Sequence, residues 1–122
     1  FESGGVAAAH AIHHGLADLP QTHGALHGEK VAFGVLVELS LSGVATAEIM
    51  QIARFLRAVG LPTTLGALGV DGSTDAISAI AHRASRPGEI IHNEPFTVDC
   101  ATTEAAVRHA DAIGRQLDEE AA

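Results

Sequence analysis

Histidine is the residue type with which this sequence could do the most chemistry. The chain holds eight histidines among 122 residues, and five of them fall between residues 10 and 27. His10 and His14 are four residues apart, so on a helix they would share one face, and His13 would lie close to that face. Imidazole suits Zn, Fe, Ni or Cu, and two histidines with one carboxylate form a common metal set. The spacing allows a metal site, and it equally allows histidines that cap a helix, pack or face solvent.

The other polar residues follow no recognisable catalytic motif. Paired zinc-finger cysteines and the His-Glu-x-x-His pattern are absent, and the glycines of residues 66–72 are not followed by Gly-Lys-Ser/Thr. Cys100 is the only cysteine, so no internal disulfide can form, and a small packed thiol is the simplest interpretation. A solvated helix face is the simplest interpretation of four charged residues, Arg54, Arg57, Glu48 and Glu38.

Apolar residues at helical spacing predict an all-α bundle of five or six helices with little strand content. The expected helices cover residues 6–14 with Ser3 as N-cap, 29–41, 47–59, 74–84, and 102 onwards. The stretch 29–41 is apolar on nearly every face, which is typical of a buried helix, although a buried strand has a similar pattern. Gly34 within it predicts a close contact with a neighbouring backbone.

The segments between these helices carry turn and breaker residues. We expect a loop over 20–28 carrying His23 and His27, and a loop with one helical turn over 61–72. Residues 89–99 are expected to be extended because Pro95 prevents an interior helix, with His92 and Asn93 anchoring the segment by hydrogen bonds. His82 and His109 are expected at the surface or its boundary, and the acidic tail 118–122 is expected to fray.

Composition limits the classes of protein to which the chain can belong. Hydrophobic residues make up 47% of the chain, which excludes intrinsic disorder, and residues 1–122 are interpreted as a single domain. A net charge of −8 repels phosphate backbones, so we expect no nucleic-acid partner. No apolar run approaches the ~18 residues of a membrane span, so no membrane partner is expected. The chain begins at Phe1 and its only methionine is Met50, so we expect it to be part of a longer protein.

Three stretches of the chain resemble one enzyme family in the same order. They are FESGGVAAAHAIH at 1–13, HGEKVAFG at 27–34 and EIIHNEPF at 89–96. These motifs resemble glycerol dehydrogenases of the iron-containing alcohol dehydrogenase superfamily, over about the last third of a family member. The resemblance implies the C-terminal helical domain of a dehydroquinate synthase-like fold, whose NAD-binding α/β domain precedes it and is absent from this chain.

The resemblance also implies a metal site. In that family a divalent metal, usually zinc and alternatively iron, lies in the cleft between the two domains. The matching positions imply His10 and His27 as metal ligands and substrate-positioning groups, with Phe1 beside the substrate pocket. The family's third ligand is an Asp upstream of this chain, and no residue of this chain is implied as a catalytic acid or base. His14 stands where the family usually has Asn, so we expect it at the helix end and not on the metal, with His13 either supporting the site or packed.

The function implied is NAD-dependent oxidation of glycerol, or a similar small polyol, to a ketone such as dihydroxyacetone. Two alternatives remain: a non-catalytic helical interaction module derived from that domain, and a dehydrogenase of another polyol. Lys30 is the only basic residue near His10 and His27, which argues against a phosphorylated substrate. The family resemblance further implies a cytoplasmic homo-oligomer, commonly an octamer, and this chain alone is expected not to oxidise glycerol.

Overall fold

The computed structural model describes residues 7–93 and 98–121 of the chain. These residues form five α-helices and no strand: α1 (Ala7–Ala17), α2 (His27–Leu41), α3 (Thr46–Ala58), α4 (Thr74–Ser85) and α5 (Cys100–Ala121). Three short 3-10 turns lie in the connections, namely η2 (Pro20–Thr22), η3 (Gly66–Leu68) and η4 (Ile90–Asn93). The expected all-α fold class is therefore confirmed, and the expected helical turn within 61–72 is η3.

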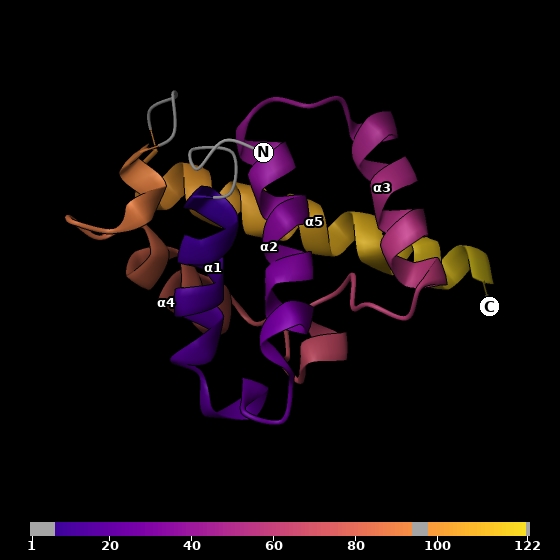
Figure 1. The fold of residues 1–122 in the computed structure, drawn as a ribbon, viewed down its shortest axis with the longest axis horizontal. Helices are drawn as coiled ribbons and strands as arrows, with labels where there is room; N and C mark the ends of the chain where they lie inside the picture. Colours follow the sequence, from indigo (N-terminus) through magenta and orange to yellow (C-terminus); the bar gives the residue numbers. More distant parts are fainter. Residues whose placement is uncertain (1–6, 94–97, 122) are drawn as a thin grey trace.

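The helices are arranged around one shared core (Figure 1). α1 and α2 lie side by side, α4 lies beside α1, and the long α5 runs across the back of the bundle to reach α3. The largest fully buried side chains come from several of these helices and include Phe33, Ile12, Leu36, Ile49 and Ile80. Each such side chain contributes roughly 1.5–3 kcal/mol of transfer free energy. Within the described residues, no helix combines the length and apolar character that crossing a bilayer demands.

Local hydrogen bonds explain where the helices begin. The side chain of Ser73 accepts a hydrogen bond from the backbone N–H of Ala76 at 3.2 Å and so caps α4. The Asp99 carboxylate accepts from Thr102 N at 2.8 Å, and Thr102 Oγ1 accepts from Asp99 N at 3.1 Å, ahead of α5. These reciprocal bonds satisfy backbone donors that a helix leaves unpaired in its first turn.

Small residues allow α1 to pack closely on two of its neighbours. A Cβ atom at Gly34 of α2 would lie 2.7 Å from the carbonyl oxygen of Ala9, and one at Gly15 would lie 2.6 Å from that of Ile80 in α4. Both distances are too short for a carbon atom, so only glycine permits these contacts. The close backbone contact predicted at Gly34 is confirmed, and it determines how near α2 can lie to the histidines of α1.

Three local expectations are wrong. Glu38 is buried, not solvated, because its carboxylate accepts a hydrogen bond from Ala9 N at 3.4 Å, at the crossing of α1 and α2. Residues 90–93 form the 3-10 turn η4 and not an extended segment, although His92 does anchor it by bonding Ser85 O at 2.8 Å. The acidic tail continues α5 to Ala121, where Arg54 and Arg57 of α3 pair with Glu120 and Asp118. The expected N-cap Ser3 lies outside the described residues.

Candidate metal centre

Imidazoles from two helices meet at one end of the α1–α2 crossing. His10, His13 and His14 lie on α1, and His27 is the first residue of α2. The ring of His13 lies with its centroid 4.1 Å from that of His27, and 5.8 Å from that of His14. The polypeptide between the two helices reverses direction through η2, and this reversal brings the start of α2 back beside the second half of α1 (Figure 1).

The environment of His13 favours the neutral form of its imidazole ring. The pKa of His13 is lowered, chiefly because burial disfavours the charged ring. Coulombic interactions with His27, His14, Lys30 and His10 lower this pKa further, in that order. A neutral imidazole is the form that binds a metal ion, so the donors present at this crossing fit zinc or another borderline cation.

A buried carboxylate ties the end of α1 to the segment after α4. Glu89 Oε1 lies 2.6 Å from His14 Nδ1, and its second oxygen pairs with Arg83. Arg83 Nε in turn lies 3.0 Å from Asp18 Oδ2, just beyond α1. The side chain of Glu89 is only 9% exposed, so this carboxylate needs both partners. His14 does lie in the last turn of α1, as expected, but its ring nitrogen is directed to Glu89.

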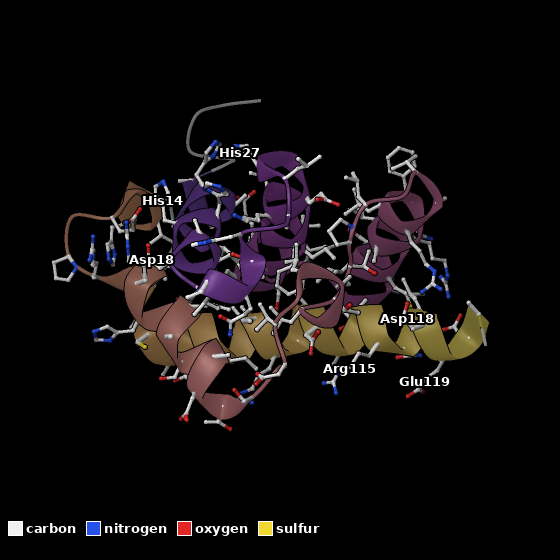
Figure 2. All side chains as sticks on the ribbon, turned by 90° about the horizontal axis from the view of Figure 1, so that it is seen from below. His14, Asp18, His27, Arg115, Asp118 and Glu119 are labelled. Carbon is white, nitrogen blue, oxygen red and sulfur yellow. The ribbon has the colours of Figure 1, made fainter. Side chains whose placement is uncertain are left out.

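The two metal ligands predicted from the sequence, His10 and His27, differ in burial. His10 is half-buried in α1 and His27 is exposed, and the ring in contact with His27 is that of His13. His14 and His27 lie on the same side of the bundle, away from Arg115 and Asp118 of α5 (Figure 2). Over the two described stretches, no three His, Cys, Asp or Glu side chains are grouped closely enough to hold a metal. Phe1 lies outside the described residues.

Sequence reasoning missed two residues beside the cluster. Glu89 belongs to the third motif of the resemblance, but nothing in the sequence pattern pairs it with His14, 75 positions away. The sequence identifies Lys30 only as the nearest basic residue, whereas the structure buries it with 8% of its surface exposed. Its place inside the apolar stretch of α2 is the sequence signal that could have revealed this burial.

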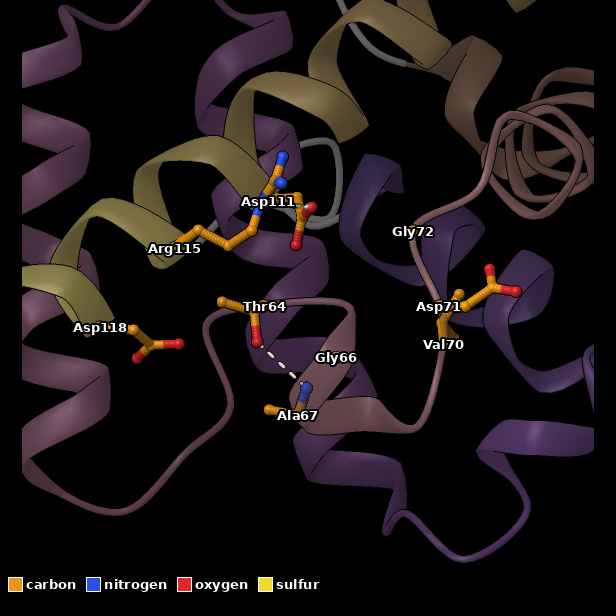
Figure 3. Close-up of a pocket in the computed structure, with 9 residues that line it drawn as sticks. All are labelled: Thr64, Gly66, Ala67, Val70, Asp71, Gly72, Asp111, Arg115 and Asp118. Carbon is orange, nitrogen blue, oxygen red and sulfur yellow. Dashed lines mark hydrogen bonds and ion pairs between the residues drawn. The ribbon is translucent and has the colours of Figure 1, made fainter.

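A second polar region lies at the opposite side of the molecule. A cavity of about 400 Å³ opens between α5 and the loop around η3, lined by residues that include Thr64, Asp71, Asp111 and Arg115 (Figure 3). Asp111 is buried, and its carboxylate accepts from Leu65 N at 2.8 Å and pairs with Arg115 Nε at 3.1 Å. Its charge is thus used to attach the loop to α5.

The fold and the sequence are both similar to part of the glycerol dehydrogenases. It is 48% identical over 116 residues to a glycerol dehydrogenase of Thermotoga maritima, covering 94% of this chain. It is 46% identical over 118 residues to one of Pseudomonas putida, covering 96% of this chain. It superposes on a probable glycerol dehydrogenase of Sinorhizobium meliloti with a TM-score of 0.85 at 46% identity, covering 90% of this chain and 31% of that one. No family model matches.

These matches confirm the resemblance to glycerol dehydrogenases that the three sequence motifs indicate. The chain is a relative of the glycerol dehydrogenases, and its fold matches a helical domain of their structures. The chain spans 32% of the length of the two curated relatives described above.

Proposed function

We propose that this chain is the helical, metal-binding part of an NAD-dependent glycerol dehydrogenase that oxidises glycerol to dihydroxyacetone. The observation that carries the proposal is the meeting of imidazoles from α1 and α2 at one crossing, in a chain 46–48% identical to glycerol dehydrogenases. Residues 1–122 form one domain in this proposal. The cofactor-binding α/β domain and the third, acidic metal ligand belong to the remainder of the enzyme.

The proposed metal ligands are His10 of α1 and His27 of α2. Zinc is the proposed metal, with iron as the alternative, because imidazole nitrogens bind both. A divalent cation held there supplies positive charge that eases loss of a proton from a bound hydroxyl group. NAD would be held mainly by the part of the enzyme outside this chain, and it would supply the hydride acceptor.

The chain's own residues position the substrate and keep the site in shape. His10 and His27 come from different helices, so together they fix the orientation of a polyol relative to both. Glu38 and Gly34 hold the two helices at close distance, because Glu38 bonds Ala9 N and Gly34 contacts the Ala9 carbonyl. Glu89 keeps the His14 ring directed away from this role. We also propose Phe1 as a residue beside the substrate pocket.

The proposal also covers the location, assembly and partners of the complete enzyme. We propose a cytoplasmic homo-oligomer, with glycerol or a similar small polyol as partner and neither nucleic acid nor membrane bound. A non-catalytic module or a dehydrogenase of another polyol would keep the same helical fold, so activity must decide between them.

The test is NADH formation by the complete gene product, purified and loaded with zinc. Glycerol should support turnover better than ethanol or a phosphorylated triol, and chelation of the metal should abolish it. Absence of turnover with every polyol, despite bound NAD and a folded protein, would favour the non-catalytic module. Turnover restricted to another polyol would replace glycerol as the substrate.

A further inference from the structure

Three helices meet at a hydrogen-bonded group of side chains that lies apart from the histidines of the candidate metal centre. His109 belongs to α5, and its Nδ1 lies 2.8 Å from the hydroxyl oxygen of Ser40 in the last turn of α2. Its Nε2 lies 3.1 Å from the hydroxyl oxygen of Thr46, the first residue of α3. A serine hydroxyl bonded to a histidine that a third group orients is the arrangement that activates a serine as a nucleophile.

The surroundings of the two hydroxyl groups favour one tautomer of His109. Ser40 is half-buried, and His109 is the hydrogen-bond partner of its hydroxyl group among the described residues. Thr46 is exposed, so water can accept its hydroxyl proton while its oxygen accepts the Nε2 proton of His109. Nδ1 then carries the lone pair and accepts the proton of Ser40. His109 is thus placed to act as a base for Ser40.

This pair of side chains opens onto a cavity of about 440 Å³ between the end of α2 and the first half of α5. The residues that line the cavity are Ser40, Leu41, Thr102, Ala105, Ala106 and His109. None of these side chains is permanently charged, and three of them are purely apolar. The cavity therefore suits a small uncharged molecule with a short apolar chain.

We propose that Ser40 and His109 form a nucleophile–base pair that cleaves small uncharged esters bound in this cavity. The Ser40 oxygen attacks the carbonyl carbon of the ester while its proton passes to His109 Nδ1. The bond from that carbon to the alcohol oxygen then breaks, and the departing alcohol takes the proton, which leaves the acyl group on Ser40.

The second half of the reaction restores the serine. A water molecule attacks the acyl group while one of its protons passes to His109 Nδ1, and the acid is released as His109 returns that proton to the Ser40 oxygen. No step uses a metal or a nicotinamide, so this activity goes beyond the proposed function and is independent of it.

The first test is covalent labelling of the chain, freed of metal with a chelator, by a fluorophosphonate. The serine oxygen bonds to phosphorus and fluoride leaves, and peptide mass spectrometry compares the labelling rates of different serines in the same sample. We expect Ser40 to react about a hundredfold faster than Ser42, because a positioned base contributes an effect of that order. Ser42 is a matched internal control, since it is exposed and its hydroxyl donates to the carbonyl oxygen of Leu39.

A variant of the base separates catalysis from a structural role of His109. Glutamine can still hydrogen-bond to the hydroxyl groups of Ser40 and Thr46, but it cannot take up a proton. In His109→Gln the labelling of Ser40 should therefore fall to the rate of Ser42, while the circular dichroism spectrum is unchanged. His82→Gln, which alters an exposed histidine of α4, should leave the labelling of Ser40 unchanged. If His109→Gln does not fold, the comparison of Ser40 with Ser42 in the unaltered chain still decides.

The second test is hydrolysis of p-nitrophenyl acetate by the same metal-free chain. We expect a burst of p-nitrophenol together with an acetyl group on Ser40. Both should be lost in Ser40→Ala and kept in Ser42→Ala.

Three outcomes would each overturn the proposal. They are labelling of Ser40 no faster than that of Ser42, equal labelling of Ser40 in folded His109→Gln, and ester cleavage that Ser40→Ala leaves unaffected. Zinc, NAD and glycerol enter neither readout, so failure here is distinguishable from failure of the proposed function.

Discussion

Two of the close glycine contacts in this bundle lie in regions that use polar groups in opposite ways. At the α1–α2 crossing, Gly34 lies against the Ala9 backbone, and Lys30 is buried with no hydrogen bond or ion pair among the described residues. Where α5 meets the loop around η3, Gly114 lies against Thr63, and the buried Asp111 is paired with both Leu65 N and Arg115. The first region brings imidazoles of two helices together beside a buried lysine, whereas the second uses its charge to fix a loop. We therefore propose the first as the functional region, although the second contains a cavity.

The largest effect is expected at the second region. A Cβ atom at Gly114 would lie 1.8 Å from the carbonyl oxygen of Thr63, so Gly114→Ala must displace the loop and should destabilise the fold by about 3 kcal/mol or more. The matched control is Gly66→Ala, whose Cβ atom would meet only Thr64 Oγ1 at 3.8 Å. Urea unfolding followed by circular dichroism measures both. Equal stability of the two variants would mean that α5 and the loop are not in close contact.

Gly34, in the first region, should tolerate a larger side chain slightly better than Gly114 does. Gly34→Ala would bring a Cβ atom to 2.7 Å from Ala9 O, and we expect a loss of about 1–3 kcal/mol as α2 moves outward. Gly34→Leu should lose more. Gly28→Ala, one turn or more from any such contact, should change little. Thermal unfolding midpoints compare the three, and an unchanged midpoint for Gly34→Leu would exclude a close α1–α2 contact.

Removing the paired carboxylate tests whether the second region is structural. Asp111→Ala deletes the acceptor of Leu65 N and the partner of Arg115, and should cost about 2 kcal/mol. Asp118→Ala removes an exposed carboxylate paired with Arg57 and should cost less than about 0.5 kcal/mol. Denaturant midpoints measure the contrast. Similar losses in both variants would show that burial of Asp111 has no energetic consequence.

The smallest effect concerns the start of α5 and depends on pH. Hydrogen bonds from Thr102 lower the pKa of Asp99 below its ordinary value, so the carboxylate stabilises the fold in its charged form. That stabilisation is fully present above the ordinary pKa and is lost as pH falls through the lowered one. The difference in unfolding free energy between the unaltered chain and Asp99→Ala should therefore be constant near neutral pH and shrink below about pH 4. A difference that grows on acidification would contradict this.

The sequence predicted the helices well because their signals are local. The apolar stripe of 47–59 became α3, and Gly34 within an apolar run became a close contact, since period and residue size suffice for both. Glu38 could not be placed from sequence, because its partner Ala9 lies 29 positions away and only the crossing of two helices joins them. The pairing of His14 with Glu89 was likewise inaccessible, since it depends on how the segment after α4 returns to α1.

For the candidate site, the sequence motifs supplied His10 and His27, but the contact between His13 and His27 required the folded hairpin of α1 and α2. Lys30 was visible as a residue and not as a buried charge. A lysine within an apolar stretch can be recognised from sequence, but how far it is buried is a property of the packed structure.

The central claim is that His10 and His27 hold a metal in the complete enzyme while His14 does not. Zinc per protein, measured by elemental mass spectrometry for His10→Ala, His27→Ala and His14→Ala of the complete gene product, tests it most directly. We expect almost complete loss of metal in the first two variants and retention in His14→Ala, because the His14 ring is committed to Glu89. Loss of metal in His14→Ala with retention in His27→Ala would contradict the account.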